Sequence, residues 1–481
     1  MKSIRKVLIA NRGEIAVRVI KTLDKLGVES VAVYSDPDRG SPHVMMASEA
    51  YPLEGTSSAE TYLDIDKIID IARRAEVDAI HPGYGFLSEN AQFAERVEDA
   101  GMIFIGPPAA AIRAMGDKLE ARAMAQAHGV PIVAGTLHPV RDISQARQKA
   151  EEVGYPVLLK AAAGGGGKGM RVVWERSSFD EQFERARSEA RNAFGNDAVY
   201  IEKYIERPRH IEIQIAADAY GHIVHLFERE CSIQRRHQKV VEEAPANHLQ
   251  PEVVQAMAQA AMAIARACGY RNAGTVEFLV DDRQRFYFLE MNTRLQVEHP
   301  VTEMITGIDL VELQLRIAEG KPLPFRQEEI QRNGHAIELR VYAEDPRQNF
   351  MPSTGVLSKY YEPTGPGIRV DSGVMAGMEI PVWYDPLLAK LIVWGQTRAQ
   401  AIERMKRAIS NYVIEGVATT LPFGAQVMLH PDFVDGNYAT DFVEHLSPSM
   451  LTEEERQMLS QLALRIYLDA IQRLQLSKSD R

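Results

Sequence analysis

The stretch from residue 286 to residue 300 constrains the fold of this chain most strongly. Its polar and apolar side chains alternate, as they do on a β-strand that has one buried face. The apolar positions are Leu289, Met291, Leu295 and Val297. The polar positions are Glu290, Asn292, Arg294, Gln296 and Glu298. An ordinary strand with one wet face is the alternative, but two carboxylates, two amides and a guanidinium favour a reaction site.

The chemistry of that polar face suggests two adjoining sites. Carboxylate and amide oxygens suit Mg²⁺, which also takes phosphate oxygens as ligands. Arg294 could hold a planar anion through two parallel hydrogen bonds. Glu298 beside such an anion could serve as a base. We therefore expect a magnesium–nucleotide site next to a small-anion site.

Composition excludes several classes of protein. A length of 481 residues predicts two or three domains, and 45% hydrophobic residues is ordinary for a globular chain. No apolar run is long enough to span a bilayer, so no membrane partner is expected. The net charge of −11 argues against nucleic-acid binding. Only Cys231 and Cys268 occur, which excludes a disulfide framework and predicts a reducing, cytoplasmic location.

Residues 1–117 alternate between short apolar strands and helical patterns. This order predicts a parallel sheet with crossover helices, and hence an α/β fold class. Asp36 follows the second strand, where a nicotinamide-dependent oxidoreductase would hold its cofactor. The first turn, residues 11–14, lacks the GxGxxG fingerprint and argues against that function. Residues 81–90 form a glycine-rich turn at the end of a later strand, and a ligand site and a structural turn remain open there.

Residues 118–204 predict a linker helix and a small α/β lid. One helical pattern covers residues 114–126 and carries Lys118. Strands at 157–160 and 171–174 enclose a glycine run from Gly164 to Gly167. Consecutive glycines let backbone N–H groups approach a phosphate, which favours a nucleotide-covering flap over a flexible linker. It is not a Walker A loop, because no Ser or Thr follows Lys168.

Residues 205–445 form the largest predicted unit, an α+β domain. Glu277 lies on a strand that could pair with residues 286–291, so that Glu277 and Glu290 would face each other and require a cation. Glu338 and Arg340 fall on one face of a strand at 336–342. The basic run at 229–239 predicts a solvated face by default. Residues 446–481 predict a helical tail, either docking a partner or packing on its own domain.

Together these motifs resemble the biotin carboxylase component of biotin-dependent carboxylases, an ATP-grasp enzyme. The resemblance covers about residues 4–445 and rests on long motifs in order. They are residues 11–16, 81–90, 164–170, 202–204, 235–246 and 290–302. It implies an N-terminal doubly wound domain, a lid with the glycine flap, and a C-terminal half completing the ATP cleft.

The resemblance also implies a role for each matching residue. Contacts to ATP fall on Lys118, Lys160, Gly166, Gly167, Glu202, Lys203, Ile205, His210, Gln234 and His237. Ligands to Mg²⁺ or Mn²⁺ fall on Glu277, Glu290 and Asn292. Bicarbonate contacts fall on Lys239, Arg294, Gln296 and Val297, the last through its backbone. Biotin contacts fall on Tyr84 and Arg340. Glu298 is implied as the catalytic base. Arg294, Lys239 and Arg340 are implied as further catalytic residues.

The sequence departs from the complete carboxylases of the family. It has no Ala-Met-Lys-Met motif for attaching biotin, because Met405-Lys406 lies in a helical Glu-Arg-Met-Lys-Arg context. The resemblance therefore implies a separate biotin carrier protein and a separate carboxyltransferase as partners, and a homodimer. Residues 341–346 and 349–353 resemble acyl-CoA or pyruvate carboxylase subunits.

Two further functions compete with this interpretation. Another carboxyphosphate-forming ATP-grasp ligase, such as half of a carbamoyl-phosphate synthase, would show a second ATP-grasp copy and lack residues 235–239 in this form. A nucleotide-binding scaffold that had lost catalysis would show a broken residue set, whereas the implied catalytic residues are all present.

Overall fold

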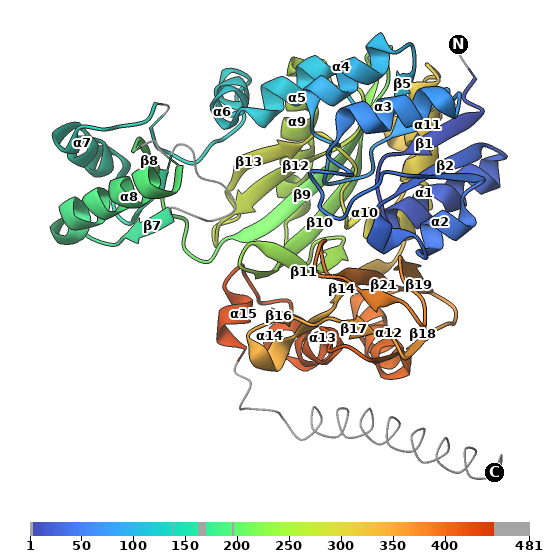
Figure 1. Cartoon of the computed structure of the whole chain (residues 1–481). Coiled ribbons are helices and arrows are strands. Elements are labelled where there is room, and N and C mark those ends of the chain that lie inside the picture. Colours follow the sequence, from blue (N-terminus) through green and yellow to red (C-terminus); the bar gives the residue numbers. More distant parts are fainter. Residues whose placement is uncertain (1–2, 137, 162–169, 195–196, 447–481) are drawn as a thin grey trace.

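The computed structural model describes residues 3–136, 138–161, 170–194 and 197–446. Three sheets organise the described chain: a five-stranded sheet near the N-terminus, a three-stranded sheet in a projecting lid, and an eight-stranded sheet between and below them (Figure 1). Among the described residues, no helix combines the length and apolar character needed to cross a bilayer.

The N-terminal sheet is parallel, with the order β3-β2-β1-β4-β5. Val7 and Ile9 of β1 pack into one core, while Leu8 packs into another on the opposite face. Burial on both faces confirms the doubly wound prediction, because crossover helices must cover both sides of such a sheet. The strands are β1 (Lys6–Ile9), β2 (Glu29–Tyr34), β3 (Glu49–Pro52), β4 (Ala79–His81) and β5 (Ile103–Phe104). The helices are α1 (Gly13–Leu26), α2 (Pro42–Met46), α3 (Ile65–Arg74) and α4 (Ala91–Asp99).

The single helix predicted over residues 114–126 is wrong. Two helices occur instead, α5 (Ala109–Gly116) and α6 (Lys118–Ala127). Between them Asp117 adopts an extended conformation, and its side chain accepts hydrogen bonds from the backbone N–H groups of Leu119 and Glu120. An aspartate in this position caps a new helix and so interrupts the earlier pattern.

The lid has a three-stranded antiparallel sheet of order β7-β6-β8. Its strands are β6 (Val157–Ala161), β7 (Met170–Val173) and β8 (Val199–Lys203), and its helices are α7 (Ile143–Val153) and α8 (Phe179–Phe194). Val157, Leu159, Phe179 and Phe183 form its separate core. The glycine flap at 162–169, which includes Gly166 and Gly167, lies outside the described residues.

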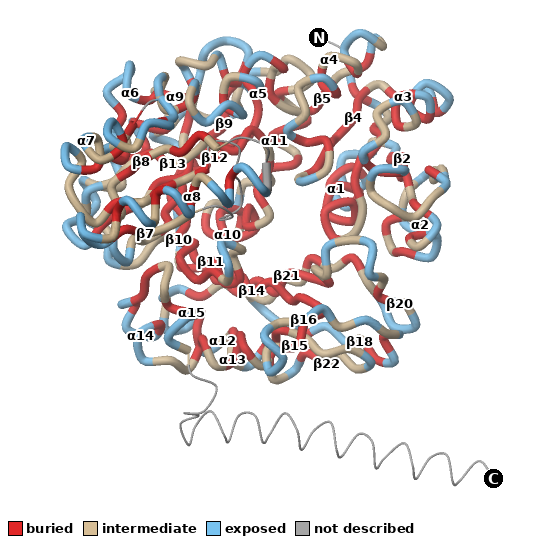
Figure 2. The backbone as a smooth tube through the Cα atoms, turned by 60° about the vertical axis from the view of Figure 1, so that its left-hand side comes forward, coloured by how far each residue is buried: buried red, intermediate tan, exposed pale blue. Residues whose placement is uncertain are grey.

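The large sheet is antiparallel throughout, with the order β13-β12-β9-β10-β11-β14-β21-β19. Its six inner strands are buried along most of their length, whereas the edge strands β13 and β19 are largely half-buried (Figure 2). The strands of this sheet are β9 (Arg209–Ala217), β10 (Ile223–Arg235), β11 (Gln238–Ala244), β12 (Asn272–Val280), β13 (Phe286–Asn292), β14 (His335–Tyr342), β19 (Ile368–Ser372) and β21 (Leu387–Gly395). The helices around it include α9 (Pro251–Ala267), α10 (His299–Thr306), α11 (Leu310–Ala318) and α12 (Arg398–Asn411).

Short elements complete the C-terminal region. They are β15 (Glu344–Asp345), β16 (Met351–Pro352), β17 (Gly355–Val356), β18 (Lys359–Tyr361), β20 (Glu379–Ile380), β22 (Val413–Glu415), α13 (Leu421–Leu429), α14 (Pro431–Val434) and α15 (Phe442–His445). Apart from its first residue, the helical tail predicted at 446–481 lies outside the described residues, so its role stays a prediction.

Two expectations for the large sheet are wrong. The alternating strand predicted through residue 298 ends at Asn292, and Glu298 stands at the start of α10. The basic run at 229–239 is solvated only at its turn, Arg236 and His237, because β10 continues through it to Arg235 and Arg229 is fully buried. A charged run can be buried when other strands of the sheet supply opposite charges.

Candidate active site

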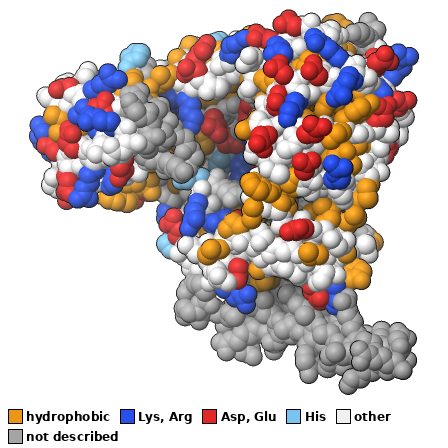
Figure 3. Space-filling model, viewed as in Figure 1, with side chains coloured by type: hydrophobic (Ala, Val, Ile, Leu, Met, Phe, Trp, Pro, Cys, Tyr) orange, Lys and Arg blue, Asp and Glu red, His pale blue; other side chains and the backbone are white. Residues whose placement is uncertain are grey.

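Polar side chains run across one face of the large sheet. In the strand register Glu290 lies opposite Glu277, Glu277 opposite Glu212, and Glu212 opposite Arg229. Residues directly opposite each other on paired strands share a face, so the sheet gathers a row of carboxylates there. The molecular surface is hollowed between the lid and the body, with acidic and basic side chains within the hollow (Figure 3).

Lys239 of β11 links two carboxylates of that face, Glu212 and Glu277, to Glu298. Its Nζ lies 2.6 Å from Glu212 Oε2, 2.8 Å from Glu277 Oε1 and 2.5 Å from Glu298 Oε1. Burial would lower the pKa of the Lys239 ammonium, but these three carboxylates outweigh it and hold the pKa well above its ordinary value. Lys239 is therefore a fixed positive charge at the centre of the site.

The end of β13 and the loop after it both donate hydrogen bonds to the carboxylate of Glu277. Asn292 Nδ2 donates to Glu277 Oε1 at 2.9 Å, and Gln296 Nε2 donates to that oxygen at 3.1 Å. Arg294 donates from Nη2 to Asn292 Oδ1 at 2.9 Å and from Nη1 to Gln296 Oε1 at 2.8 Å. The polar residues predicted to form one site thus lie close together. A loop after Asn292, and not a continued strand, brings in Arg294 and Gln296.

The turn at 81–90 reaches this loop from the N-terminal domain. Glu89 Oε2 accepts from Arg294 Nε at 2.8 Å, and Glu89 Oε1 accepts from the Thr293 backbone N–H at 3.0 Å. The turn therefore does more than reverse the chain, because it fixes the orientation of Arg294 from a different domain.

Glu298 is fully buried between two cations. Arg340 Nη2 lies 2.9 Å from Glu298 Oε2, opposite the contact with Lys239, and Arg340 Nε donates to Glu242 Oε1 at 2.6 Å. Burial would raise the pKa of the Glu298 carboxyl, but Lys239 and Arg340 hold it well below its ordinary value. Burial raises the pKa of Glu242 to about 7, against the opposing charge of Arg340.

The Glu277–Glu290 pair has the chemistry of a divalent-cation site. The two residues face each other in the register, and His210 Nε2 lies 3.0 Å from Glu277 Oε2. Gln234 Nε2 lies 2.9 Å from His210 Nδ1, which brings both predicted nucleotide residues beside the pair. Burial first, and then the charge of Glu277, raise the pKa of Glu290. Two such carboxylates fit Mg²⁺ or Mn²⁺, which would relieve their repulsion.

The remaining predicted nucleotide residues lie around this centre, and the charge of Lys118 reaches Glu290, where it opposes the rise in pKa. Lys160 of β6 pairs with Glu202 of β8, which also accepts from Arg122 Nη1 at 2.8 Å. Lys203 Nζ donates to the backbone carbonyls of residues 154 and 155 at 3.0 and 2.8 Å. Ile205 is half-buried after β8, Lys118 is exposed at the start of α6, and His237 is exposed in the turn between β10 and β11.

Two predicted substrate contacts meet at β21. The Val297 carbonyl accepts from Lys390 Nζ at 2.8 Å, and the Tyr84 ring centre lies 5.8 Å from the same Nζ. Tyr84 comes from the N-terminal domain, so the described chain brings the loop after β13, the turn at 81–90 and β21 to one place.

The motifs of the sequence did not predict Glu212, Arg229 and Glu242, three charged residues in or beneath the site. Arg229 is fully buried, and its Nε pairs with Glu212. A signal for Glu212 existed in β9, where His210, Glu212 and Gln214 alternate with isoleucines. Such alternation marks a polar sheet face, as it does in β13.

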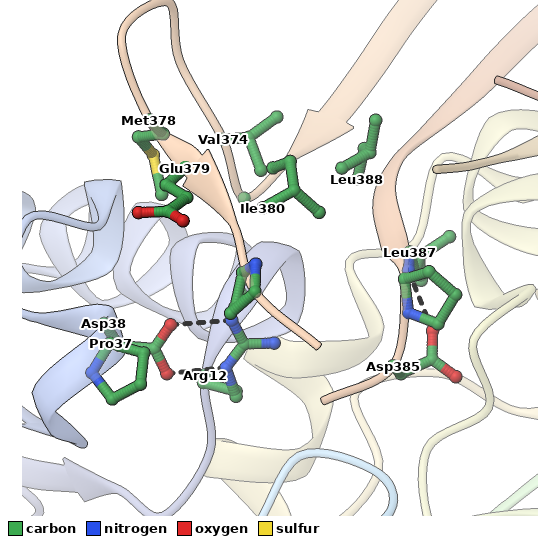
Figure 4. A pocket seen from close by; sticks show the side chains of 14 residues that line it. Arg12, Pro37, Asp38, Val374, Met378, Glu379, Ile380, Asp385, Leu387 and Leu388 are labelled. Atoms are coloured by element: carbon green, nitrogen blue, oxygen red, sulfur yellow. Dashed lines mark hydrogen bonds and ion pairs between the residues drawn. The ribbon is translucent and has the colours of Figure 1, made fainter. Parts of the chain in front are cut away.

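A separate cavity of about 30 Å³ lies between α1 and the loop before β21. Arg12 binds Asp38 beside it through Nε and Nη2, both at 2.6 Å (Figure 4). A cavity of this size is far below the several hundred Å³ of a ligand pocket, so it cannot take a nucleotide.

Three family models match successive parts of the chain. The biotin carboxylase N-terminal domain matches residues 3–112, the ATP-binding domain of the carbamoyl-phosphate synthase L chain matches residues 117–326, and the biotin carboxylase C-terminal domain matches residues 338–445.

Curated relatives match along nearly the whole sequence. Biotin carboxylase 2 of Bacillus subtilis is 52% identical, over 92% of this chain and 99% of its own. The α subunit of mouse methylcrotonoyl-CoA carboxylase is 52% identical over 92% of this chain, and the pig propionyl-CoA carboxylase α chain is 50% identical over 97%. The chain spans less of those two relatives, 62% and 65% of their lengths.

Solved structures agree in fold and coverage. The biotin carboxylase domain dimer of Hydrogenobacter thermophilus 2-oxoglutarate carboxylase, solved with MgADP, ADP and bicarbonate, is 47% identical with a TM-score of 0.87, over 92% of this chain and 98% of its own. A Campylobacter jejuni biotin carboxylase is 45% identical with a TM-score of 0.87, over 92% of this chain and 99% of its own. The chain therefore belongs to the biotin carboxylase family of ATP-dependent ligases.

Proposed function

We propose that this chain carboxylates biotin at the expense of ATP and bicarbonate, with the residues around Lys239 as its active site. The observation that carries the proposal is the meeting of Lys239, Arg340 and Glu298 within hydrogen-bond distance, next to the Glu277–Glu290 pair. A base, two fixed cations and a candidate metal site are the groups that phosphoryl transfer to bicarbonate needs.

The first step is the activation of bicarbonate. Lys239, Arg294, Gln296 and the Val297 backbone hold the anion beside Glu298, which removes its proton. In the present arrangement Lys239 and Arg340 keep Glu298 a weak base. Once Lys239 donates to bicarbonate in place of Glu298, the carboxylate loses part of that stabilisation and its basicity rises.

The second step transfers the phosphoryl group. An oxygen of the deprotonated bicarbonate attacks the γ-phosphorus of ATP, the bond to the β-phosphate oxygen breaks, and ADP and carboxyphosphate result. Glu277, Glu290 and Asn292 would hold the divalent cation, which supplies positive charge to the phosphates. Lys118, Lys160, Gly166 and Gly167 are proposed to contact those phosphates, and Glu202, Lys203, Ile205, His210, Gln234 and His237 the rest of the nucleotide.

The third step carboxylates biotin. Carboxyphosphate breaks to CO₂ and phosphate, and the phosphate takes the proton from biotin N1′. Arg340 holds the resulting ureido enolate with a fixed charge, Tyr84 contacts the ring, and N1′ attacks CO₂. Closure of the lid excludes water, which would otherwise hydrolyse the intermediate.

We further propose the setting of this reaction. Biotin arrives on a separate carrier protein, and a separate carboxyltransferase passes the carboxyl group to an acyl-CoA or pyruvate-type acceptor, as the names of the relatives suggest. The chain works as a homodimer, in keeping with the dimer described for the H. thermophilus domain. A cytoplasmic location fits two unpaired cysteine thiols, Cys231 and Cys268.

The test is ADP release by the purified chain with MgATP and bicarbonate, with and without free biotin. We expect biotin to stimulate turnover, and Glu298→Gln to lower the stimulated rate by about 10²-fold or more while nucleotide still binds. Glu403→Gln, an exposed change of the same kind on α12, is the matched control and should leave the rate unchanged. Turnover that ignores biotin would indicate another carboxyphosphate enzyme. Nucleotide binding without turnover, even with a biotinylated carrier protein, would indicate a scaffold.

A further inference from the structure

Lys390 is a fully buried cation outside the residues that the proposed reaction uses. It lies on β21 between two paired strands, opposite Arg340 of β14 and opposite Asp371 of β19. Residues opposite each other share a sheet face, so the Lys390 side chain lies next to that of Arg340. A lysine with no exposed surface must have its charge and its hydrogen-bond donors matched by the protein.

The partners of Lys390 come from three separated parts of the chain. Its Nζ donates to the Val297 carbonyl at 2.8 Å, lies 3.2 Å from Glu14 Oε2 on α1, and lies 3.9 Å from Asp371 Oδ2. Asp371 Oδ2 also lies 2.7 Å from Arg369 Nη2. Within the described part of the chain, by contrast, Lys390 is the cation nearest to Glu14. The ammonium thus ties the N-terminal domain and the end of the large sheet to the loop after β13.

The group that Lys390 holds is critical for the site. The Val297 carbonyl belongs to the peptide unit that leads into Glu298, the proposed base. On the neighbouring strand Arg340 holds the carboxylate of Glu298 at 2.9 Å. Arg340 therefore binds the side chain of Glu298, and the adjacent Lys390 binds the main chain immediately before it.

We infer that Lys390 is a positioning residue for the bicarbonate site: it fixes the Val297–Glu298 peptide so that the Val297 backbone and the Glu298 carboxylate meet the anion together. This inference rests on the proposed function. Lys390 itself contacts none of the three substrates in the proposed reaction. A small displacement of a reacting group can cost about 10²-fold in rate, so this main-chain anchor has a measurable consequence.

The test is steady-state kinetics of Lys390→Met, with bicarbonate and MgATP varied separately and biotin saturating. We expect kcat/KM for bicarbonate to fall by about 10²-fold, while calorimetric binding of MgADP changes less than about threefold. Lys390→Arg restores a donor and a charge, so it should recover part of the loss. Lys406→Met, which removes a lysine paired with Glu403 on α12, is the matched control and should behave as the wild type.

A second variant separates positioning from folding. Lys390→Met leaves Glu14 without its cation, so Glu14→Gln/Lys390→Met should recover thermal stability but not the kinetics with bicarbonate. Recovery of both together would overturn the inference, because stability alone would then explain the defect. Unchanged kinetics in folded Lys390→Met would also overturn it, as would an equal loss of MgADP affinity. A wild-type chain without bicarbonate-dependent turnover would overturn the proposed function and this inference with it.

Discussion

Glu277 of β12 and Glu290 of β13 lie directly opposite each other in the strand register. Glu277 is tied to Lys239, Asn292 and Gln296, whereas the pKa of Glu290 is raised by its burial and by the charge of Glu277. We therefore expect Glu290→Gln to raise the Mg²⁺ concentration needed for half-maximal ATP turnover by at least about tenfold, within the range seen when the surroundings of a metal are altered. A Mg²⁺ titration at fixed ATP measures this, and an unchanged midpoint would remove Glu290 from the metal site.

Arg340 should matter for biotin more than for ATP. Removing one fixed donor from a developing anion costs about 10²–10³-fold, so Arg340→Met should lower biotin-stimulated turnover by that factor while MgADP binding persists. Arg340→Lys keeps a charge without the planar fork that reaches Glu242 and Glu298, so only partial recovery is expected. Full activity of either variant would exclude the proposed role.

Arg229 is predicted to support the fold beneath the site. Its guanidinium is fully buried and donates to Gln214, Thr275 and Thr302 at 2.7, 3.1 and 3.0 Å, besides its pair with Glu212. Arg229→Met should lower the free energy of unfolding by about 3–5 kcal/mol, because buried Glu212 loses one of its two cations and three buried polar groups lose their donor. Adding Glu212→Gln should return part of that loss.

The control for this change is an exposed ion pair. Arg147→Met breaks a pair with Asp180 on the lid surface and should cost less than about 1 kcal/mol. Chemical denaturation of the four chains compares these values. A similar small cost for Arg229→Met would show that the buried pair contributes little.

Glu230 should make stability depend on pH. Glu230 is buried, and its Oε2 lies 3.1 Å from Arg209 Nη1. Burial raises the pKa of the Glu230 carboxyl from 4.5 to about 7. The folded state therefore binds this proton more tightly than the unfolded state, and stability falls as pH rises from about 4.5 to about 7. Relative to Glu230→Gln, the wild type should lose up to about 3 kcal/mol between pH 4.5 and pH 8. Parallel stability curves for the two chains would contradict this.

Local pattern was sufficient for much of the fold. Alternating apolar strands and helices predicted the parallel N-terminal sheet, and Gly27 ends α1 in the left-handed conformation with φ of 68°. The pairing of Glu277 with Glu290 also followed from sequence, because the two strands are joined by a short turn and each carries one acid among apolar residues. The roles of the site residues came from a resemblance to a family, and they stay predictions.

Tertiary structure decided what local pattern could not. Whether a charge is buried depends on partners from distant strands, so the sequence could not show that Arg229 lies in the core or that Lys390 anchors Val297. The same holds for the segment after Asn292, where a side-chain network rather than a strand pleat gathers Arg294, Gln296 and Glu298. The sequence by itself determined where polar and apolar residues alternate along a strand and which turns end the strands, because those are short-range effects of the backbone. The charge balance of the site was decided only when the sheet brought β9, β11, β12, β14 and β21 together, because electrostatic partners are chosen by distance in space.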